Sequence, residues 1–244
     1  ALLAAVSASV NKGGKILVAR NCHKAVYHAL YLRELQPVYI YPHEDQRLGI
    51  NGGISPERVE RYLEENTDVQ AFLLTSPTYD GVVSDIKTIA EVVHRHKIPL
   101  IVDEAHGAHL HYSKYFPVSA ADLGADIVIQ SFHKTLPSMT QTAVLHICSD
   151  MADVEKIKRF MGIYQTSSPS YILMGSIDGC LHMLSENGEM LYKAYTERLQ
   201  KLRNAIHEQC RWIKLPEYEE LDAACSKDYD KSKIVLSVRN TGMT

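Results

Sequence analysis

The chain has 244 residues, of which 45% are hydrophobic and 23% are charged, and its formal net charge is −3. This composition is typical of a globular protein with one substantial core, and the small negative charge gives no electrostatic basis for nucleic-acid binding. No apolar run approaches the roughly 20 residues that cross a bilayer. The apolar stretch at 1–6 also lacks the basic region of a signal peptide. We therefore expect neither a nucleic-acid nor a membrane partner.

Cysteine usage indicates a reducing compartment. The sequence has five cysteines, scattered without paired spacing. An odd and unpatterned set in a chain of this size favours free thiols and a cytoplasmic location. The cysteines are Cys22, Cys148, Cys180, Cys210 and Cys225.

Strands and helices alternate along the first part of the chain. Short runs of branched apolar residues predict strands buried on both faces, and apolar residues at helical spacing predict the helices between them. Ser55 and Pro56 are a typical helix start. The alternation predicts an α/β fold with a mostly parallel sheet and helices on both faces. Expected strands are 15–19, 38–41, 71–74, 99–102, 127–130 and 143–147. Expected helices are 1–10, 85–97 and 152–162, with one more that includes the apolar residues of 26–32 and another that starts at 55–58.

The pattern changes after residue 149. Two longer helices are expected over 170–186 and 190–210, and the apolar run 233–238 predicts a strand. We interpret 1–165 as a large domain, and 166–244 as interface helices followed by the start of a smaller α+β domain.

Two predicted strands end in residues that can take part in catalysis or bind a cofactor. Asp103 follows one buried run, and Ser131, His133 and Lys134 follow the next. Ligands of open α/β sheets bind beyond the carboxyl ends of the strands, so these side chains are expected in one crevice. A cofactor between them could use Lys134 as a covalent anchor and Asp103 as a counter-charge.

Six motifs in chain order resemble the major domain of the Orn/Lys/Arg decarboxylases. These are pyridoxal 5'-phosphate (PLP) enzymes of the aspartate aminotransferase fold, fold type I. The first helix looks like the one that follows the family's phosphate-cradling loop, so the resemblance implies that this loop precedes residue 1. The motifs are Asn-Cys-His-Lys at 21–24, Pro-Thr-Tyr-Asp-Gly at 77–81, Val-Asp-Glu-Ala-His-Gly-Ala-His at 102–109, Ser-Phe-His-Lys-Thr-Leu-Pro at 131–137, Thr-Gln at 140–141 and Thr-Ser-Ser-Pro-Ser-Tyr at 166–171.

The resemblance implies a role for each matching residue around the cofactor ring. Lys134 would hold PLP covalently, and Asp103 would pair with the protonated ring nitrogen. His23 would stack on the ring, and Ala105 would let the ring lie against the backbone. His106 stands where relatives often carry an aromatic residue, and Tyr79 and Asp80 would lie at the cofactor's edge, where Asp80-Gly81 also suits an ordinary turn.

Further matching residues would reach the phosphate or the substrate. Ser131 and His133 would face the cofactor phosphate or the substrate, and His133 or Lys134 would return a proton during the reaction. Thr166 and Ser167 belong to a segment that reaches the phosphate of the neighbouring subunit, which implies a homodimer with shared active sites.

The implied activity is decarboxylation of arginine, lysine or ornithine to an amine of polyamine metabolism. The same Lys134 and Asp103 pair serves aminotransferases and other lyases of this fold, and a catalytically inert PLP-binding domain is a further alternative. A different alternative starts from His106, His109 and His111 near Asp103, which are residue types that bind zinc or iron. That cluster would suit a metal-dependent hydrolase, although no His-Glu-x-x-His pattern is present.

Overall fold

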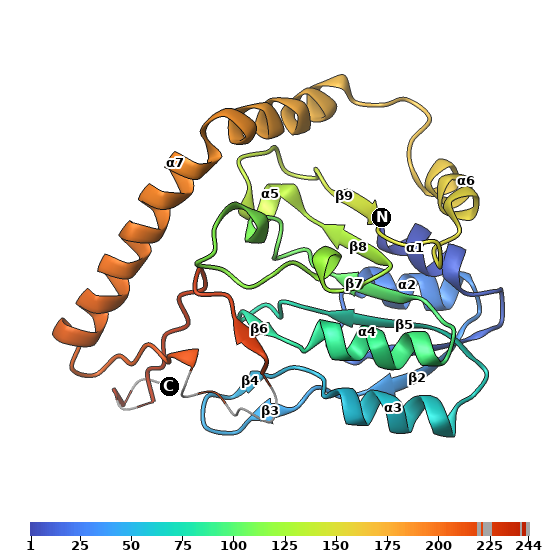
Figure 1. The fold of residues 1–244 in the computed structure, drawn as a ribbon, viewed down its shortest axis with the longest axis horizontal. Helices are drawn as coiled ribbons and strands as arrows, with labels where there is room; N and C mark the ends of the chain where they lie inside the picture. The colour runs from blue at the N-terminus through green and yellow to red at the C-terminus, as the bar shows by residue number, and fades with distance from the viewer. Residues whose placement is uncertain (219–220, 222–225, 240, 243–244) are drawn as a thin grey trace.

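A six-stranded sheet forms the centre of the molecule, in the order β2-β1-β5-β7-β8-β9 (Figure 1). The computed structural model describes residues 1–218, 221, 226–239 and 241–242. The first five strands are parallel to their neighbours, and β9 is antiparallel to β8. The predicted α/β fold with a mostly parallel sheet is confirmed. The strands are β1 Lys15–Ala19, β2 Gln36–Ile40, β5 Val69–Thr75, β7 Leu100–Asp103, β8 Ile127–Gln130 and β9 Val144–Ile147.

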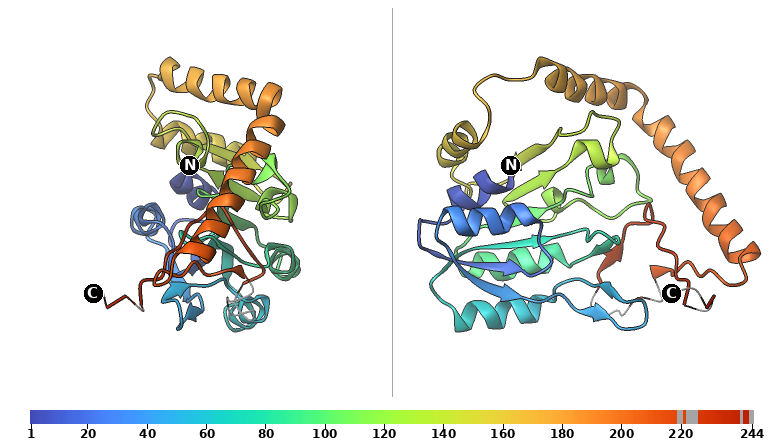
Figure 2. Two further views of the ribbon diagram at one scale, coloured as in Figure 1. Left: turned by 90° about the vertical axis from the view of Figure 1, so that its left-hand side faces the viewer. Right: turned by 180° about the vertical axis from the view of Figure 1, so that it is seen from behind.

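Helices cover both faces of this sheet, as the edge-on view of Figure 2 shows. Alternate residues of β1 point to opposite faces: Leu17 packs in one apolar cluster, and Ile16 and Val18 in the other. The helices α3 (Pro56–Glu65) and α4 (Ile86–Arg95) contribute to the first cluster. The second receives α1 (Leu2–Ser9), α2 (Lys24–Leu32) and α6 (Val154–Tyr164). Burial on both faces explains why the central strands are mostly apolar.

One long helix replaces the two that were predicted after residue 170. Helix α7 is continuous over Tyr171–Gln209, 39 residues, and Figure 1 shows it bending as it crosses one side of the molecule. Gly188 lies within it and is buried, with its open side toward the ring of Tyr112. The predicted interruption at 187–189 is therefore wrong, because the helix continues through this glycine.

The C-terminal part also differs from the prediction. Residues 233–238 form no strand; Ser237 makes only an isolated bridge with Lys214. Instead, β10 (Asp228–Tyr229) pairs antiparallel with β6 (Val82–Val83). Two-residue strands carry no periodic signal, which explains why the sequence did not indicate them.

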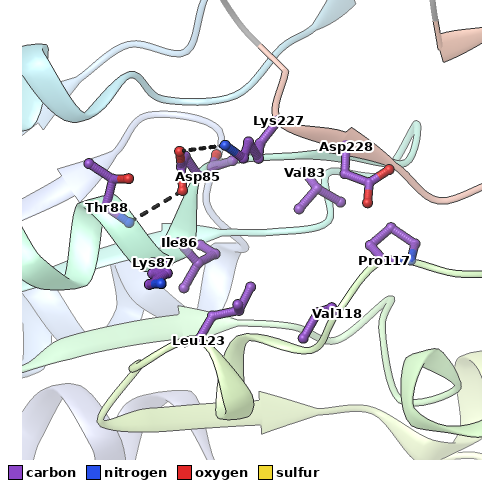
Figure 3. A pocket seen from close by; sticks show the side chains of 11 residues that line it. Val83, Asp85, Ile86, Lys87, Thr88, Pro117, Val118, Leu123, Lys227 and Asp228 are labelled. Carbon is purple, nitrogen blue, oxygen red and sulfur yellow. Dashed lines mark hydrogen bonds and ion pairs between the residues drawn. The ribbon is translucent and has the colours of Figure 1, made fainter. Parts of the chain in front are cut away.

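An ion pair holds this returning segment against the start of α4. The Nζ atom of Lys227 lies 3.2 Å from Oδ2 of Asp85, the N-cap residue of α4, and Figure 3 shows the two side chains facing each other. The other carboxylate oxygen of Asp85 accepts a hydrogen bond from the backbone N–H of Thr88. The segment is therefore attached to β6 by backbone pairing and to the start of α4 by charge.

Smaller elements complete the fold. The expected loop around 47–53 contains part of a hairpin, formed by β3 (Glu44–Asp45) and β4 (Ile50–Asn51). A short helix, α5 (Phe132–Thr135), follows β8, and helical turns occupy Leu110–Tyr112 and Ala120–Asp122. No helix within the described residues combines the length and apolar character needed to cross a membrane. Four of the cysteines are free thiols, and Cys225 lies outside the described residues.

Candidate active site

The carboxyl ends of β7 and β8 bring the predicted pair together. Asp103 is the last residue of β7, and it lies opposite Ile129 of the neighbouring β8. Beyond β8 the chain turns into α5, so Lys134 lies on one helical turn rather than on an extended strand end. Ser131 is the N-cap residue of α5, and its hydroxyl is not used for capping.

Asp103 is a deeply buried carboxylate near positive charges. Its side chain is 2% exposed, and Oδ1 accepts a hydrogen bond of 3.2 Å from the backbone N–H of Ala105. Burial raises the pKa of Asp103; the Ala105 hydrogen bond and the charges of Lys134 and His23 oppose that shift. Asp103 is therefore within electrostatic reach of both Lys134 and His23.

His106 contacts the amino group of Lys134. Its Nε2 atom lies 3.2 Å from Nζ of Lys134, and its ring meets the ring of Tyr79 edge-on at 5.5 Å. Burial lowers the pKa of His106 to about 4, and the charge of Lys134 acts in the same direction. The imidazole is therefore neutral at pH 7, so Nε2 can accept a hydrogen bond from the lysine ammonium.

Two other predicted residues occupy the same edge of the sheet. His23 is the exposed N-cap residue of α2, where its Nδ1 accepts a 3.2 Å hydrogen bond from the N–H of Ala25. His133 lies on α5 beside Lys134, and its Nδ1 donates to the carbonyl of Thr142 at 2.8 Å. That bond leaves Nε2 of His133 as the atom available to a ligand.

Thr166 and Ser167 lie on the exposed linker between α6 and α7 (Figure 1). The hydroxyl of Thr166 accepts a hydrogen bond of 3.2 Å from the N–H of Ser168. Within the described part of this one chain, the linker makes no hydrogen bond to the residues around Lys134. The expected role of Thr166 and Ser167 toward a neighbouring subunit stays a prediction.

A buried network supports the two strand ends from behind. Glu104 is 1% exposed and accepts hydrogen bonds from Ser119 Oγ at 2.7 Å and Gln130 Nε2 at 2.6 Å. Gln130 in turn contacts Nε2 of His146 at 3.1 Å. A hydrogen bond thus joins Glu104, next to Asp103, to Gln130, next to Ser131.

The structure adds Asp230 and Lys233, two residues that the sequence did not single out. Nε2 of His109 lies 3.2 Å from Oδ1 of Asp230, and both side chains are buried. Lys233, one turn further on, lines a pocket of about 360 Å³ together with Lys134. The charged run at 227–233 has the composition of a solvated surface, but Tyr229 and Asp230 within it are buried where β10 pairs with β6.

The three histidines of the metal alternative point to three different partners. His106 contacts Lys134, His109 contacts Asp230, and His111 lies 3.2 Å from Asp122. No group of three or more His, Cys, Asp or Glu side chains with metal-binding geometry occurs among residues that the structure describes. The observed pairings give the hydrolase alternative no support.

Comparisons with known proteins agree with this geometry. The profile of the "Orn/Lys/Arg decarboxylase, major domain" matches residues 1–232. The arginine decarboxylase of Bacillus anthracis is 34% identical over 244 residues, which is 100% of this chain and 49% of that protein. The chain thus spans about half the length of the curated relatives it matches.

Solved structures show the same fold. Lysine decarboxylase A from Pseudomonas aeruginosa superimposes with a TM-score of 0.72 at 21% identity, covering 93% of this chain and 34% of that one. A PLP-bound putative aminotransferase from Clostridium difficile 630 gives a TM-score of 0.66 at 14% identity, covering 88% of this chain and 56% of that one. With the profile match across nearly its whole length, this chain belongs to the PLP-dependent Orn/Lys/Arg decarboxylase family.

Proposed function

We propose that this protein decarboxylates a basic amino acid, namely arginine, lysine or ornithine, with PLP as its cofactor. The observation that carries the proposal is the buried carboxylate of Asp103 within electrostatic reach of the Lys134 amine, at adjacent strand ends in a member of this family. A carboxylate with a raised pKa and one backbone hydrogen bond is stabilised by a cationic partner.

The residues present fit such a cofactor. Two buried polar atoms at the same sheet edge, Oγ1 of Thr75 and Oδ1 of Asn21, have no hydrogen-bond partner within the described chain. Thr75 lies opposite Asp103 in the strand register, and Asn21 is two residues before His23. Buried polar groups rarely remain unpaired, so these atoms favour a polar ligand at this edge.

Each residue would hold a different part of PLP. Lys134 would bind it covalently, and Asp103 would carry the counter-charge for its ring nitrogen. His23 and Ala105 would contact the ring, His106 would position the Lys134 amine, and Ser131 and His133 would bind the phosphate. The chemistry that the cofactor supplies is an electron sink for the bond that breaks.

The chain's own groups would then manage the proton. Carbon dioxide leaves the α-carbon, and a proton must take its place for an amine to form. Lys134 and His133 both lie on α5, and either side chain can carry that proton. The products would be agmatine, cadaverine or putrescine, according to the substrate.

We also propose that the active unit is a homodimer, in which Thr166 and Ser167 reach the partner's site. The support is the apolar surface that begins beside this linker: Tyr171 is 79% exposed, Ile172 72% and Met174 53%. Contiguous exposed apolar side chains favour a protein interface.

The test combines an absorption spectrum with peptide mapping. PLP is added to the protein, the sample is reduced with borohydride, and the labelled peptide is identified; we expect a new long-wavelength band and a covalent adduct on Lys134. Lys134→Ala should lose the adduct and the release of carbon dioxide from arginine, lysine and ornithine, whereas Lys87→Ala, an exposed lysine on α4, should retain both. Full turnover by Lys134→Ala would refute the proposal.

A further inference from the structure

The segment 230–233 closes a pocket beside Lys134. The N–H of Asp230 donates to the carbonyl of Gly81 at 2.8 Å, and the N–H of Lys233 donates to the carbonyl of Asp230 at 3.0 Å. Oδ1 of Asp230 contacts His109 at 3.2 Å and accepts from the N–H of Ser232 at 3.0 Å. Side chain and backbone therefore fix this segment to the loops after β5 and β7, and Figure 1 shows it returning beside β6.

Lys233 presents a cation that its neighbours leave available. Its Nζ lies 4.0 Å from Oδ2 of Asp230, which is longer than a hydrogen bond, and its side chain is 20% exposed. Burial lowers the pKa of Lys233, Asp230 opposes that shift, and the charge of Lys134 adds to it. Within the described residues the Lys233 ammonium has no hydrogen-bond acceptor, although it has three donors to satisfy.

Two other polar atoms of the pocket also lack a partner within the described chain. The pocket has a volume of about 360 Å³, and its lining residues are His109, Lys134, Thr135, Leu136, Tyr195, Ser232 and Lys233. Nδ1 of His109 and Oγ1 of Thr135 are buried and have no hydrogen-bond partner in the described chain. Two lysines and an unused hydroxyl suit an anion, and they are unsuited to the cationic end of a basic amino acid.

We propose that Lys233 is the residue that binds the α-carboxylate of the amino-acid substrate, in the pocket it shares with Lys134 and Thr135. The inference rests on the proposed function. The substrate's α-amine reacts where the Lys134 amino group stands, and the α-carboxylate is attached to the same carbon. It must therefore lie beside Nζ of Lys134, where the Lys233 ammonium and the Thr135 hydroxyl can donate to it. Asp230, which is held by His109, positions Lys233 through the backbone hydrogen bond between these two residues.

The test compares ligands that differ only in the carboxylate. An amino-acid substrate carries it, whereas the matching amine product does not. Lys233→Met keeps the aliphatic stem that packs at Gly81 and removes the charge. We expect its KM for the amino acid to rise about 10- to 150-fold, because one hydrogen bond to a charged group is lost. The inhibition constant of the amine, agmatine for arginine or cadaverine for lysine, should stay within about threefold of the unchanged protein.

Two further variants separate charge from structure. Lys233→Arg restores a cation, so most of the preference for the amino acid over the amine should return. Lys231→Met removes a neighbouring lysine that lies over the ring of Tyr115 instead of in the pocket, and it should leave both constants unchanged. If Lys233→Met does not fold, as judged by its melting curve, Lys233→Gln takes its place.

The outcomes distinguish the two proposals. An unchanged ratio of amino-acid KM to amine inhibition constant in Lys233→Met, with the Lys134 adduct intact, would overturn the role of Lys233 alone. A fall in kcat without a change in KM would also overturn it, since that result assigns Lys233 to the chemical step. Absence of the Lys134 adduct in the unchanged protein would overturn the proposed function and, with it, this inference.

Discussion

Asp103 owes its chemical character to the strand that carries it. The four residues of β7 are buried, and the strand ends on a carboxylate that water does not solvate. Burial raises the pKa of Asp103, and the nearby charges of Lys134 and His23 favour its ionised form. The residue is thus suited to a cationic ligand, while an exposed carboxylate would gain much less from one.

Replacing this carboxylate by an amide tests that role. Asp103→Asn keeps the shape and the acceptor for the Ala105 N–H but removes the charge. We expect kcat/KM to fall by at least about 100-fold, as for loss of a buried electrostatic partner of the reacting group. Asp122→Asn, a carboxylate outside this edge of the sheet, should change kcat/KM little. Steady-state assays give the answer, and retained activity in Asp103→Asn would contradict the role.

His106 predicts a specific pH dependence of stability. Its folded-state pKa is about 4, below the ordinary value of 6.5, so between these values the unfolded chain binds more protons. The contribution of His106 to the free energy of unfolding is therefore fully present above pH 6.5, and it is lost as the pH falls toward 4. Urea unfolding at several pH values should show a steeper decline for the unchanged protein than for His106→Gln. Parallel curves would exclude the shift.

At the scale of elements, local signals explain which parts were predictable. Asp103 ends one buried strand and Lys134 follows the next, so a few neighbouring residues indicate their position. Asp230 and Lys233 depend on contacts with His109 and Gly81 more than a hundred residues earlier, and β10 and β6 are too short to have a pattern. Their role could not be predicted because non-local pairing alone determines it.

Alanine substitutions at two glycines should change the free energy of unfolding in opposite directions. Gly188 lies inside α7, and an added Cβ would be 3.4 Å from the ring of Tyr112, so Gly188→Ala should raise the free energy of unfolding by about 0.5 kcal/mol. Gly81 has φ +102°, and its Cβ would lie 2.8 Å from Cγ of Lys233. Gly81→Ala should lower that free energy by about 1–3 kcal/mol. Denaturant unfolding measures both; a destabilised Gly188→Ala would instead show that the ring of Tyr112 cannot accommodate the added methyl group.

At the scale of the whole molecule, α7 and its linker hold apolar surface away from the sheet. Figure 1 shows the linker and the first half of α7 on the outside of the fold. Tyr171 and Ile172 are among the most exposed large apolar side chains of the described residues. A surface of this kind is consistent with burial by a second subunit.

The proposed dimer can be tested by sedimentation. Ile172→Asp places a charge in the exposed patch and should shift the protein toward monomer, with loss of activity. Val118→Asp, an equally apolar and 56% exposed position elsewhere, should leave the assembly unchanged. A monomeric unchanged protein with full activity would contradict the shared site.

Mixing inactive variants tests whether the site is shared. Lys134→Ala lacks the anchor, and the double variant Thr166→Ala, Ser167→Ala lacks the linker hydroxyls. If the linker serves the partner's site, a mixed dimer has one site with both defects and one with neither. Activity should therefore appear when the two proteins are refolded together, and its absence would place the linker's function within its own chain.

The pocket beside Lys134 has a consequence for the order of folding. Its walls come from the loop after β7, from α5, and from Tyr195, Ser232 and Lys233. Ribosomes deliver the N-terminal part first, so the sheet and Lys134 can assemble while the segment that carries Lys233 is still unmade. Lys134 would stand open to bulk water until Asp230 meets His109, and the completed pocket should appear as one of the last events in maturation.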